Sequence, residues 1–180
     1  FGKVSAIDWA GKIANTGTIK TELGVKLGSL TNTGRVSTAD MMVTGSIQND
    51  RNAVMQIGTL KTKDGKTKIR NDGTLSISNA ENRVTVQNTG VLAIGSFKNV
   101  SVQNKGTLKT GELKVGAADQ LVNGGTILAE KITVDGLFQN RNGTFALGTA
   151  AVAKYLEKHL DLAHQLKDLG ETLPTSVEAV

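Results

Sequence analysis

The stretch VQNTGVLAIGSFKNVSVQNKGTLKTG, from Val86 to Gly111, contains nearly the same motif twice, 16 residues apart. The first copy is V-Q-N-T-G-V-L and the second is V-Q-N-K-G-T-L. A period of this length indicates a repeat architecture, because a unit this short cannot bury its own apolar face and must be covered by its neighbours. The same unit recurs along most of the chain.

Eight units align on one asparagine, at spacings of 17, 17, 22, 17, 16, 19 and 17 residues. The anchors are Asn15, Asn32, Asn49, Asn71, Asn88, Asn104, Asn123 and Asn140. An apolar residue stands two positions before every anchor: Ile13, Leu30, Ile47, Ile69, Val86, Val102, Leu121 and Phe138. A second apolar column follows the anchors: Ile19, Val36, Ala53, Leu75, Leu92, Leu108, Ile127 and Phe145.

Polar and apolar residues alternate within each unit, for example in GTIKT at 17–21 and GTLKT at 106–110. Alternation with a period of two predicts short strands. Asn-x-Gly sequences between the strands predict tight corners, because both residue types tolerate a left-handed backbone. We therefore expect an all-β fold, a parallel β-helix of about eight rungs. The asparagine column should form a ladder of side-chain amides, each bonded to the next rung, as in cross-β stacks.

One rung is longer than the others, with 22 residues between Asn49 and Asn71. Its extra residues include the segment from Lys61 to Lys68. Insertions in solenoids emerge as loops on one face, often the binding face. The segment is thus a candidate binding loop, with tolerated length variation as the alternative; its basic residues are Lys61, Lys63, Lys66 and Lys68.

The repeat stops after Phe145, and from about Leu147 to Leu169 apolar residues recur at intervals of three and four. This period predicts an α-helix, which Gly170 would end. The predicted domains are β-helix repeats at 1–146, a helix at 147–170 and a tail at 171–180. The helix is expected to cap the last rung, whose open edge would otherwise invite aggregation. Packing against a second copy or a following domain is the alternative.

Composition argues against several functions. The chain has 180 residues, a net charge of +5, no cysteine and only 3% aromatic residues, so it lacks thiolate ligands and the large rings common in enzyme pockets. His159 and His164 are five positions apart and do not share a helix face, so we expect no metal and no cofactor. The only acidic pair that the repeat brings together is Asp50 with Asp72. We expect no catalytic residues and no enzyme activity.

Partners that need other sequence features are not expected either. The one basic cluster, KTKDGKTK, has no interleaved aromatic residues, which disfavours nucleic acid. No apolar run approaches the roughly 20 residues that span a bilayer, which disfavours stable membrane insertion.

The units LTNTGRVST, VQNKGTLKTGELKV, LVNGGTILAEKITV and LFQNRNGTFA resemble the repeats of filamentous haemagglutinin-like exoproteins. The likeness covers about Ile13 to Phe145. It implies a right-handed parallel β-helix that serves as the shaft or adhesive segment of a large bacterial surface protein. Such proteins, which include adhesins and contact-dependent inhibition exoproteins, are exported by two-partner secretion through an outer-membrane transporter. The resemblance implies a receptor, protein or glycan, on a host or neighbouring cell.

Two other functions remain open. The first is a bactofilin-like cytoskeletal β-helix, which would be cytoplasmic and self-assembling; its short rungs fit, whereas a helix over the last rung would block stacking. The second and weaker one is a carbohydrate-cleaving β-helix enzyme, which the scarce aromatic residues disfavour.

Overall fold

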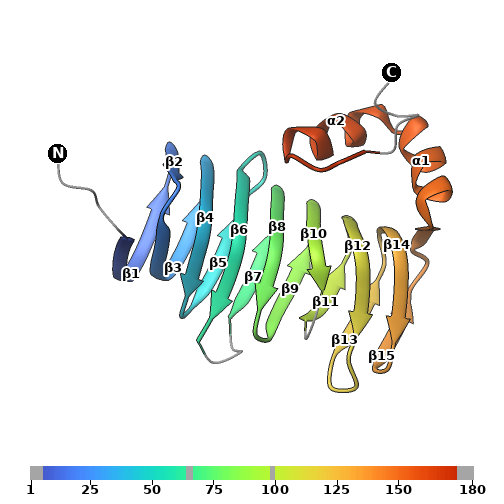
Figure 1. Ribbon diagram of the computed structural model, residues 1–180, viewed down its shortest axis with the longest axis horizontal. Coiled ribbons are helices and arrows are strands. Elements are labelled where there is room, and N and C mark those ends of the chain that lie inside the picture. The colour runs from blue at the N-terminus through green and yellow to red at the C-terminus, as the bar shows by residue number, and fades with distance from the viewer. Residues whose placement is uncertain (1–5, 64–66, 98–99, 174–180) are drawn as a thin grey trace.

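The computed structural model describes residues 6–63, 67–97 and 100–173, which form a parallel β-solenoid with two helices at its C-terminal end (Figure 1). The 16 strands make about seven turns of the coil. This number equals the number of intervals between the eight anchor asparagines. All strand pairs are parallel and join one rung to the next. The predicted β-helix is therefore confirmed.

Each turn contributes to three ladders of strands. The short-strand ladder contains the residues before each anchor asparagine. It consists of β5 (Ser46–Asn49), β7 (Lys68–Asn71), β9 (Val84–Asn88), β11 (Val100–Asn104), β13 (Gln120–Asn123) and β15 (Leu137–Asn140), together with the second halves of β1 (Ala6–Asn15) and β3 (Gly24–Asn32).

The long strands bend and serve the other two ladders. Their first halves form the second ladder and their second halves the third; they are β4 (Arg35–Val43), β6 (Val54–Thr62), β8 (Thr74–Glu81), β10 (Val91–Phe97), β12 (Thr107–Val115) and β14 (Thr126–Val134). The second ladder also contains β2 (Thr18–Thr21) and β16 (Thr144–Leu147). The first halves of β1 and β3 belong to the third ladder.

The C-terminal segment forms two helices, α1 (Thr149–Glu157) and α2 (Leu160–Asp168), where the sequence predicted one. The break lies at His159, whose backbone is not helical and whose ring Nδ1 lies 2.7 Å from the carbonyl oxygen of Tyr155. This break lets α2 turn back along the rod (Figure 1). Residues on the outer side of the second ladder, such as Ala93 and Leu128, are buried against Leu156 and Leu166.

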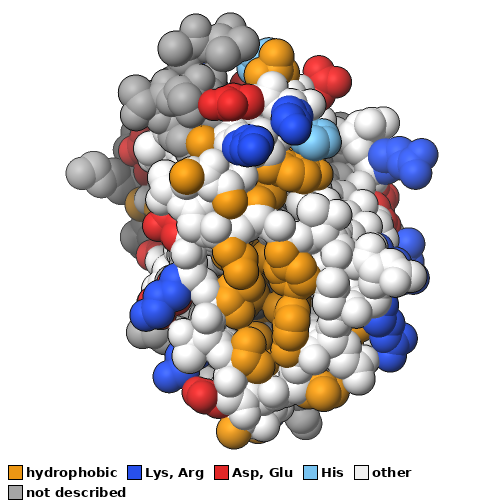
Figure 2. All heavy atoms as spheres, turned by 90° about the vertical axis from the view of Figure 1, so that its right-hand side faces the viewer, with side chains coloured by type: hydrophobic (Ala, Val, Ile, Leu, Met, Phe, Trp, Pro, Cys, Tyr) orange, Lys and Arg blue, Asp and Glu red, His pale blue; other side chains and the backbone are white. Residues whose placement is uncertain are grey.

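The helices thus cover the outer side of the second ladder, including β16, and leave the open end of the last rung uncovered. Figure 2 looks onto the C-terminal end and shows hydrophobic side chains in its centre that the helices, above, leave uncovered. Val134, Leu137 and Phe138 belong to this last turn and are 41%, 49% and 36% exposed. The helices therefore do not form the predicted cap. The argument against a bactofilin-like protein, that a helix over the last rung would block stacking of rods, also no longer holds.

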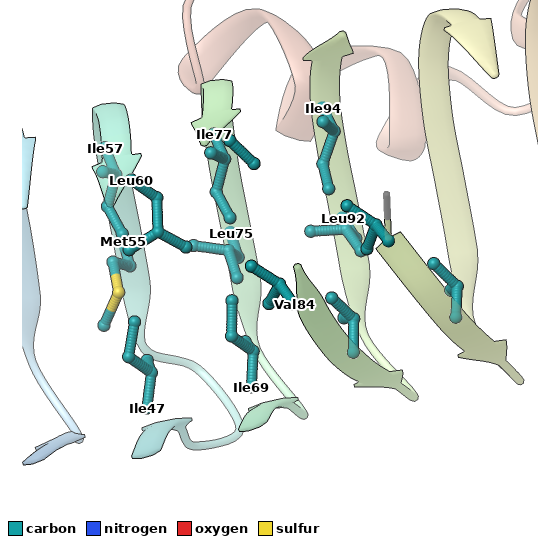
Figure 3. Close-up of a cluster of buried hydrophobic side chains, with 14 of the residues drawn as sticks. Ile47, Met55, Ile57, Leu60, Ile69, Leu75, Ile77, Val84, Leu92 and Ile94 are labelled. Carbon is teal, nitrogen blue, oxygen red and sulfur yellow. The ribbon is translucent and has the colours of Figure 1, made fainter. Parts of the chain in front are cut away.

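The core is a stack of aliphatic columns inside the tube (Figure 3). Side chains from successive rungs point inward and touch those above and below, as Ile47 and Ile69 do in the short-strand ladder and Met55, Leu75 and Leu92 in the second. One predicted core position is wrong: Met55, not Ala53, pairs with Val36 and occupies the second column. Ala53 is buried in the preceding corner instead.

This shift locates the extra residues of the long rung. Asn49 pairs with Asn32, 17 positions earlier, whereas Met55 pairs with Val36, 19 positions earlier, so two extra residues lie in the corner after Asn49. Asn52 in that corner has a positive φ of 70°. The remaining extra residues lie between β6 and β7. The insertion is therefore divided between two corners, and only one part falls within the segment from Lys61 to Lys68.

The regular corners need glycine for a different reason from the one predicted. Among the described residues, positive φ angles occur at Asn52, Asn82, Asn142, Gly148 and Gly170, and not at the Asn-x-Gly corner glycines. A Cβ atom at Gly90 or Gly106 would instead collide with backbone of the preceding rung. Glycine occupies these corner positions because neighbouring rungs approach each other too closely there for a side chain.

We expect Leu156→Ala to loosen the helices without unfolding the rod. Leu156 lies on α1 and is fully buried against the second ladder. Its truncation should therefore weaken helix docking by about 2 kcal/mol. Hydrogen exchange should accelerate in α1 and α2 and remain unchanged in the β-ladders. Leu160→Ala is the matched control because Leu160 is 38% exposed. Equal acceleration in the ladders would contradict an independently docked helix pair.

Candidate binding face on the short-strand ladder

The outer side of the short-strand ladder carries a column of mostly polar side chains that we call the amide face. Strand alternation turns the aliphatic and asparagine side chains inward, and the residue immediately before each asparagine therefore points outward. From the third rung onward this column is Gln48, Arg70, Gln87, Gln103, Val122 and Gln139. The next position after each asparagine adds the corner residues Asp50, Asp72, Thr89, Lys105, Gly124 and Arg141.

Three surface hollows lie along this face. The first, of 750 Å³, is lined by Thr33, Asp50, Arg51, Arg70, Asp72 and Thr89. The second, of 250 Å³, is lined by Arg70, Asp72, Gln87, Asn88, Thr89, Gln103 and Lys105. The third, of 760 Å³, is lined by Gln103, Asn104, Lys105, Gln120, Val122, Gly124, Leu137, Gln139 and Arg141. The hollows share residues and so form one continuous polar strip.

The acidic residues of the strip are already engaged. Gln48 donates to Asp50 at 2.7 Å, and Arg70 donates to Asp72 at 2.8 Å. Thr89 donates to Asp72 at 2.6 Å, and this bond is the main reason why the pKa of Asp72 lies below its ordinary value. A hydrolytic acid needs a carboxyl that stays protonated near neutral pH. Asp72 is held in the ionised form, which suits binding and not proton donation.

The third hollow has a different character. Lys105 and Arg141 supply positive charge, and none of its lining residues is acidic. Arg141 donates to Gln139 at 2.9 Å, which holds the guanidinium beside the glutamine column. Leu137 is 49% exposed at its margin. This end of the amide face can therefore donate hydrogen bonds to hydroxyl, carbonyl or acidic groups.

The anchor asparagines lie on the inner side of the same strands and are joined into one ladder. The Nδ2 atom of each donates to the Oδ1 atom of the next, over 2.8 to 3.1 Å, in seven consecutive bonds from Asn15 to Asn140. Most also donate to a backbone carbonyl of the next rung, as Asn71 does to Val91 at 2.9 Å. The side chains from Asn32 to Asn123 are buried, so they hold rungs together and do not face a ligand.

Of the four lysines predicted as a binding loop, the three that the structure describes do not form one cluster. Lys61 lies on the third ladder, where Glu81 pairs with it at 3.7 Å, and Lys68 lies on the short-strand ladder. Lys63 is exposed between them, and Lys66 lies outside the described residues. Of these three described lysines, Lys68 adjoins the amide face, since it precedes Arg70 by two positions on β7.

The two histidines have no common partner. His159 stacks on Tyr155 with ring centroids 4.1 Å apart, and His164 is exposed on α2. Within the described part of the chain, no group of three or more His, Asp or Glu side chains could hold a metal ion. The helices of that part are also too short and too polar to cross a membrane.

No family model, curated protein or solved structure matches this chain. The resemblance to filamentous haemagglutinin-like repeats therefore remains a prediction from the repeat residues.

Sequence reasoning missed the amide face, although its signal is present. Glutamine precedes the anchor asparagine in four of the eight units, at Gln48, Gln87, Gln103 and Gln139. The alternation that assigns asparagine to the inside assigns these glutamines to the outside. The hollows themselves had no such signal, because they depend on how corner side chains of different rungs lie together.

Proposed function

We propose that the chain is a rigid structural segment of a secreted bacterial surface protein, of the haemagglutinin-like kind, and that the amide face is its adhesive surface. The observation that carries this proposal is the amide face itself, a row of hydrogen-bonding side chains, interrupted at Val122, in register on a continuously bonded rod. Strand spacing repeats these groups every 4.8 Å or so along the rod. Such a row suits an extended partner better than a small molecule.

The chemistry of the face favours a glycan chain as that partner. Glutamine amides and arginine guanidinium groups bond readily to hydroxyl and carbonyl oxygens. The basic hollow around Lys105 and Arg141 adds attraction for an acidic sugar. A protein receptor with an acidic extended segment is the second form of the same proposal, and a comparison of glycan with peptide binding separates the two.

Export to the cell surface belongs to the proposal on the strength of the repeat resemblance. The cysteine-free composition fits a chain that folds outside the cell without forming disulfides. The stacked rungs supply the necessary stability through the core and the asparagine ladder instead. The proposed export partner is an outer-membrane transporter of the two-partner type.

We expect charge reversal on the amide face to weaken attachment to cells. The double variant Lys105→Glu with Arg141→Glu should bind glycan-bearing cells or arrayed acidic glycans at least about tenfold more weakly, because two attractive contacts become repulsive. Lys114→Glu is the matched control, since Lys114 is an exposed lysine on the third ladder. Binding is measured with the labelled chain at moderate ionic strength.

The same assay tests the lysine segment. If changing Lys61, Lys63, Lys66 and Lys68 to glutamate abolishes binding and the amide-face double variant does not, the proposed surface is wrong and the long rung carries adhesion. If neither set affects any ligand, the adhesive function fails and only the structural role of the rod remains.

A further inference from the structure

The chain contains two Asn-Gly dipeptides, and the fold places them in opposite surroundings. In such a dipeptide the backbone nitrogen of the glycine can reach the side-chain carbonyl carbon of the asparagine, because glycine has no side chain to obstruct the approach. Asn123-Gly124 lies in the corner between β13 and β14, and Asn142-Gly143 lies in the corner between β15 and β16. The two corners therefore present the same reactive pair under different restraint.

Asn123 is held by both neighbouring rungs. Its side chain is fully buried in the asparagine ladder, where its Oδ1 accepts from Asn104 at 2.8 Å and its Nδ2 donates to Asn140 at 3.1 Å. The backbone nitrogen of Gly124, which would have to attack, donates to the carbonyl oxygen of Asn104 at 2.7 Å. Both reacting groups are thus engaged, and a reaction between them would require the ladder to open.

Asn142 lacks these restraints. Its side chain is exposed, and no hydrogen bond holds its amide within the described part of the chain. The backbone nitrogen of Gly143 donates to the Oδ1 of Asn140 at 3.1 Å, and no further rung follows this corner among the described residues. With a φ of 62°, Asn142 must rotate before Gly143 can approach its side chain. This rotation breaks bonds to the Asn140 side chain without separating the rungs.

We propose that Asn142 is a site of self-modification, at which the chain converts its own asparagine to aspartate and isoaspartate. The nitrogen of Gly143 bonds to the Cγ atom of Asn142 and loses its proton, while the bond from Cγ to Nδ2 breaks and Nδ2 leaves as ammonia with that proton. Water then opens the resulting succinimide ring at either carbonyl. Water is therefore the only other reactant, and ammonia is the only other product.

The modification changes the basic hollow of the amide face. Arg141 precedes Asn142 and lines this hollow, and its guanidinium donates to Gln139 at 2.9 Å. A carboxylate at position 142 brings a negative charge beside Arg141 and weakens the attraction for acidic groups. Isoaspartate also adds a carbon atom to the main chain between Asn140 and Gly143, which disrupts the two bonds that join them.

Peptide mapping by mass spectrometry tests the reaction in the folded chain. After incubation at neutral to mildly alkaline pH, aspartate and isoaspartate should appear at position 142, and Asn123 should convert at least about tenfold more slowly. The reaction at position 142 should accelerate as the pH rises, because the deprotonated glycine nitrogen is the nucleophile. Asn142→Gly is the control, since glycine accepts the positive φ and has no amide to lose. In urea both dipeptides should react at similar rates.

Two results would overturn the proposal. An intact Asn142 in the folded chain, together with its conversion in urea, would mean that the corner protects it. Equal rates at Asn123 and Asn142 in the folded chain would mean that the buried ladder gives no protection and that exposure does not select position 142.

Asn142→Asp tests what the modification does to binding. It supplies the charge of the product without extending the main chain, and it should bind arrayed acidic glycans about twofold to fivefold more weakly, whereas Asn142→Gly should bind them unchanged. This consequence rests on the proposed function, whereas the reaction at Asn142 does not. If Lys105→Glu with Arg141→Glu weakens binding and Asn142→Asp does not, adhesion stands and its regulation through Asn142 fails. If neither weakens binding, the proposed adhesive surface fails, and peptide mapping alone decides whether Asn142 is modified.

Discussion

Replacing Asn71 with alanine is expected to lower the free energy of unfolding by about 3 to 5 kcal/mol. The Asn71 side chain is fully buried in the middle of the ladder. It accepts a bond from Asn49 at 2.9 Å and donates to Asn88 at 2.8 Å and to the carbonyl of Val91 at 2.9 Å. Alanine removes all three bonds and leaves the Oδ1 of Asn88 buried without its donor, which carries a desolvation cost, while the Nδ2 of Asn49 keeps only its bonds to the carbonyls of Ala53 and Thr74.

Asn140→Ala is the matched control for this prediction. Asn140 is exposed at the end of the ladder, so water can replace the bond from Asn123 and the bonds to Gly143. Its loss should cost about 1 kcal/mol. Urea unfolding measures both effects, and hydrogen exchange shows whether the rungs that flank Asn71 open first. Equal losses for the two variants would mean that the buried ladder contributes no more than an exposed amide.

The second large effect is expected for Gly106→Ala, at about 3 kcal/mol or more. A Cβ at this position would collide with the carbonyl oxygen of Gly90 and lie 2.6 Å from the carbonyl carbon of Thr89. Both are backbone groups of the preceding rung and cannot rotate away. Relief requires the rungs to separate, which stretches the bonds from Thr107 to Gly90 at 2.9 Å and from Gly106 to Asn88 at 3.2 Å.

Gly17→Ala provides the comparison, because it makes the same substitution at the same kind of corner, where an added Cβ meets nothing within 4 Å. Its stability should match or slightly exceed that of the unmodified chain, since alanine has less conformational freedom to lose on folding. Thermal unfolding of both variants at the same low protein concentration measures the difference. A similar loss at both glycines would indicate that backbone conformation, and not the approach of neighbouring rungs, demands glycine.

These variants bear on function as well as on stability. In the proposed role as a shaft, force would pass from each rung to the next, so a single buried ladder defect should be the mechanically weak point. The amide face depends on the same bonds, because its residues keep their spacing only while the rungs beneath them remain in register. Adhesion assays on ladder variants therefore require a stability measurement beside them.

The sequence by itself determined the coil, its core columns and its asparagine ladder. In a stacked coil each rung meets its equivalent in the next, so the contact between Asn71 and Asn88 recurs in the next pair, Asn88 and Asn104. A contact that repeats is visible as a period in the sequence. The prediction from this period failed where the repeat is locally irregular, because it placed Ala53 in a column that Met55 occupies.

Only the tertiary structure decided where the helices lie, what the corner glycines are for and which surface is polar and hollowed. The helices are held by contacts that occur once, such as the ion pair between Lys109 and Glu171 at 2.6 Å and the bond from Gln56 to the carbonyl of Asp168 at 3.2 Å. Such contacts join residues 62 and 112 positions apart and leave no period in the sequence. The physical reason is that rung-to-rung packing follows from local repetition, whereas docking of unlike surfaces depends on shapes that exist only after the rod has formed.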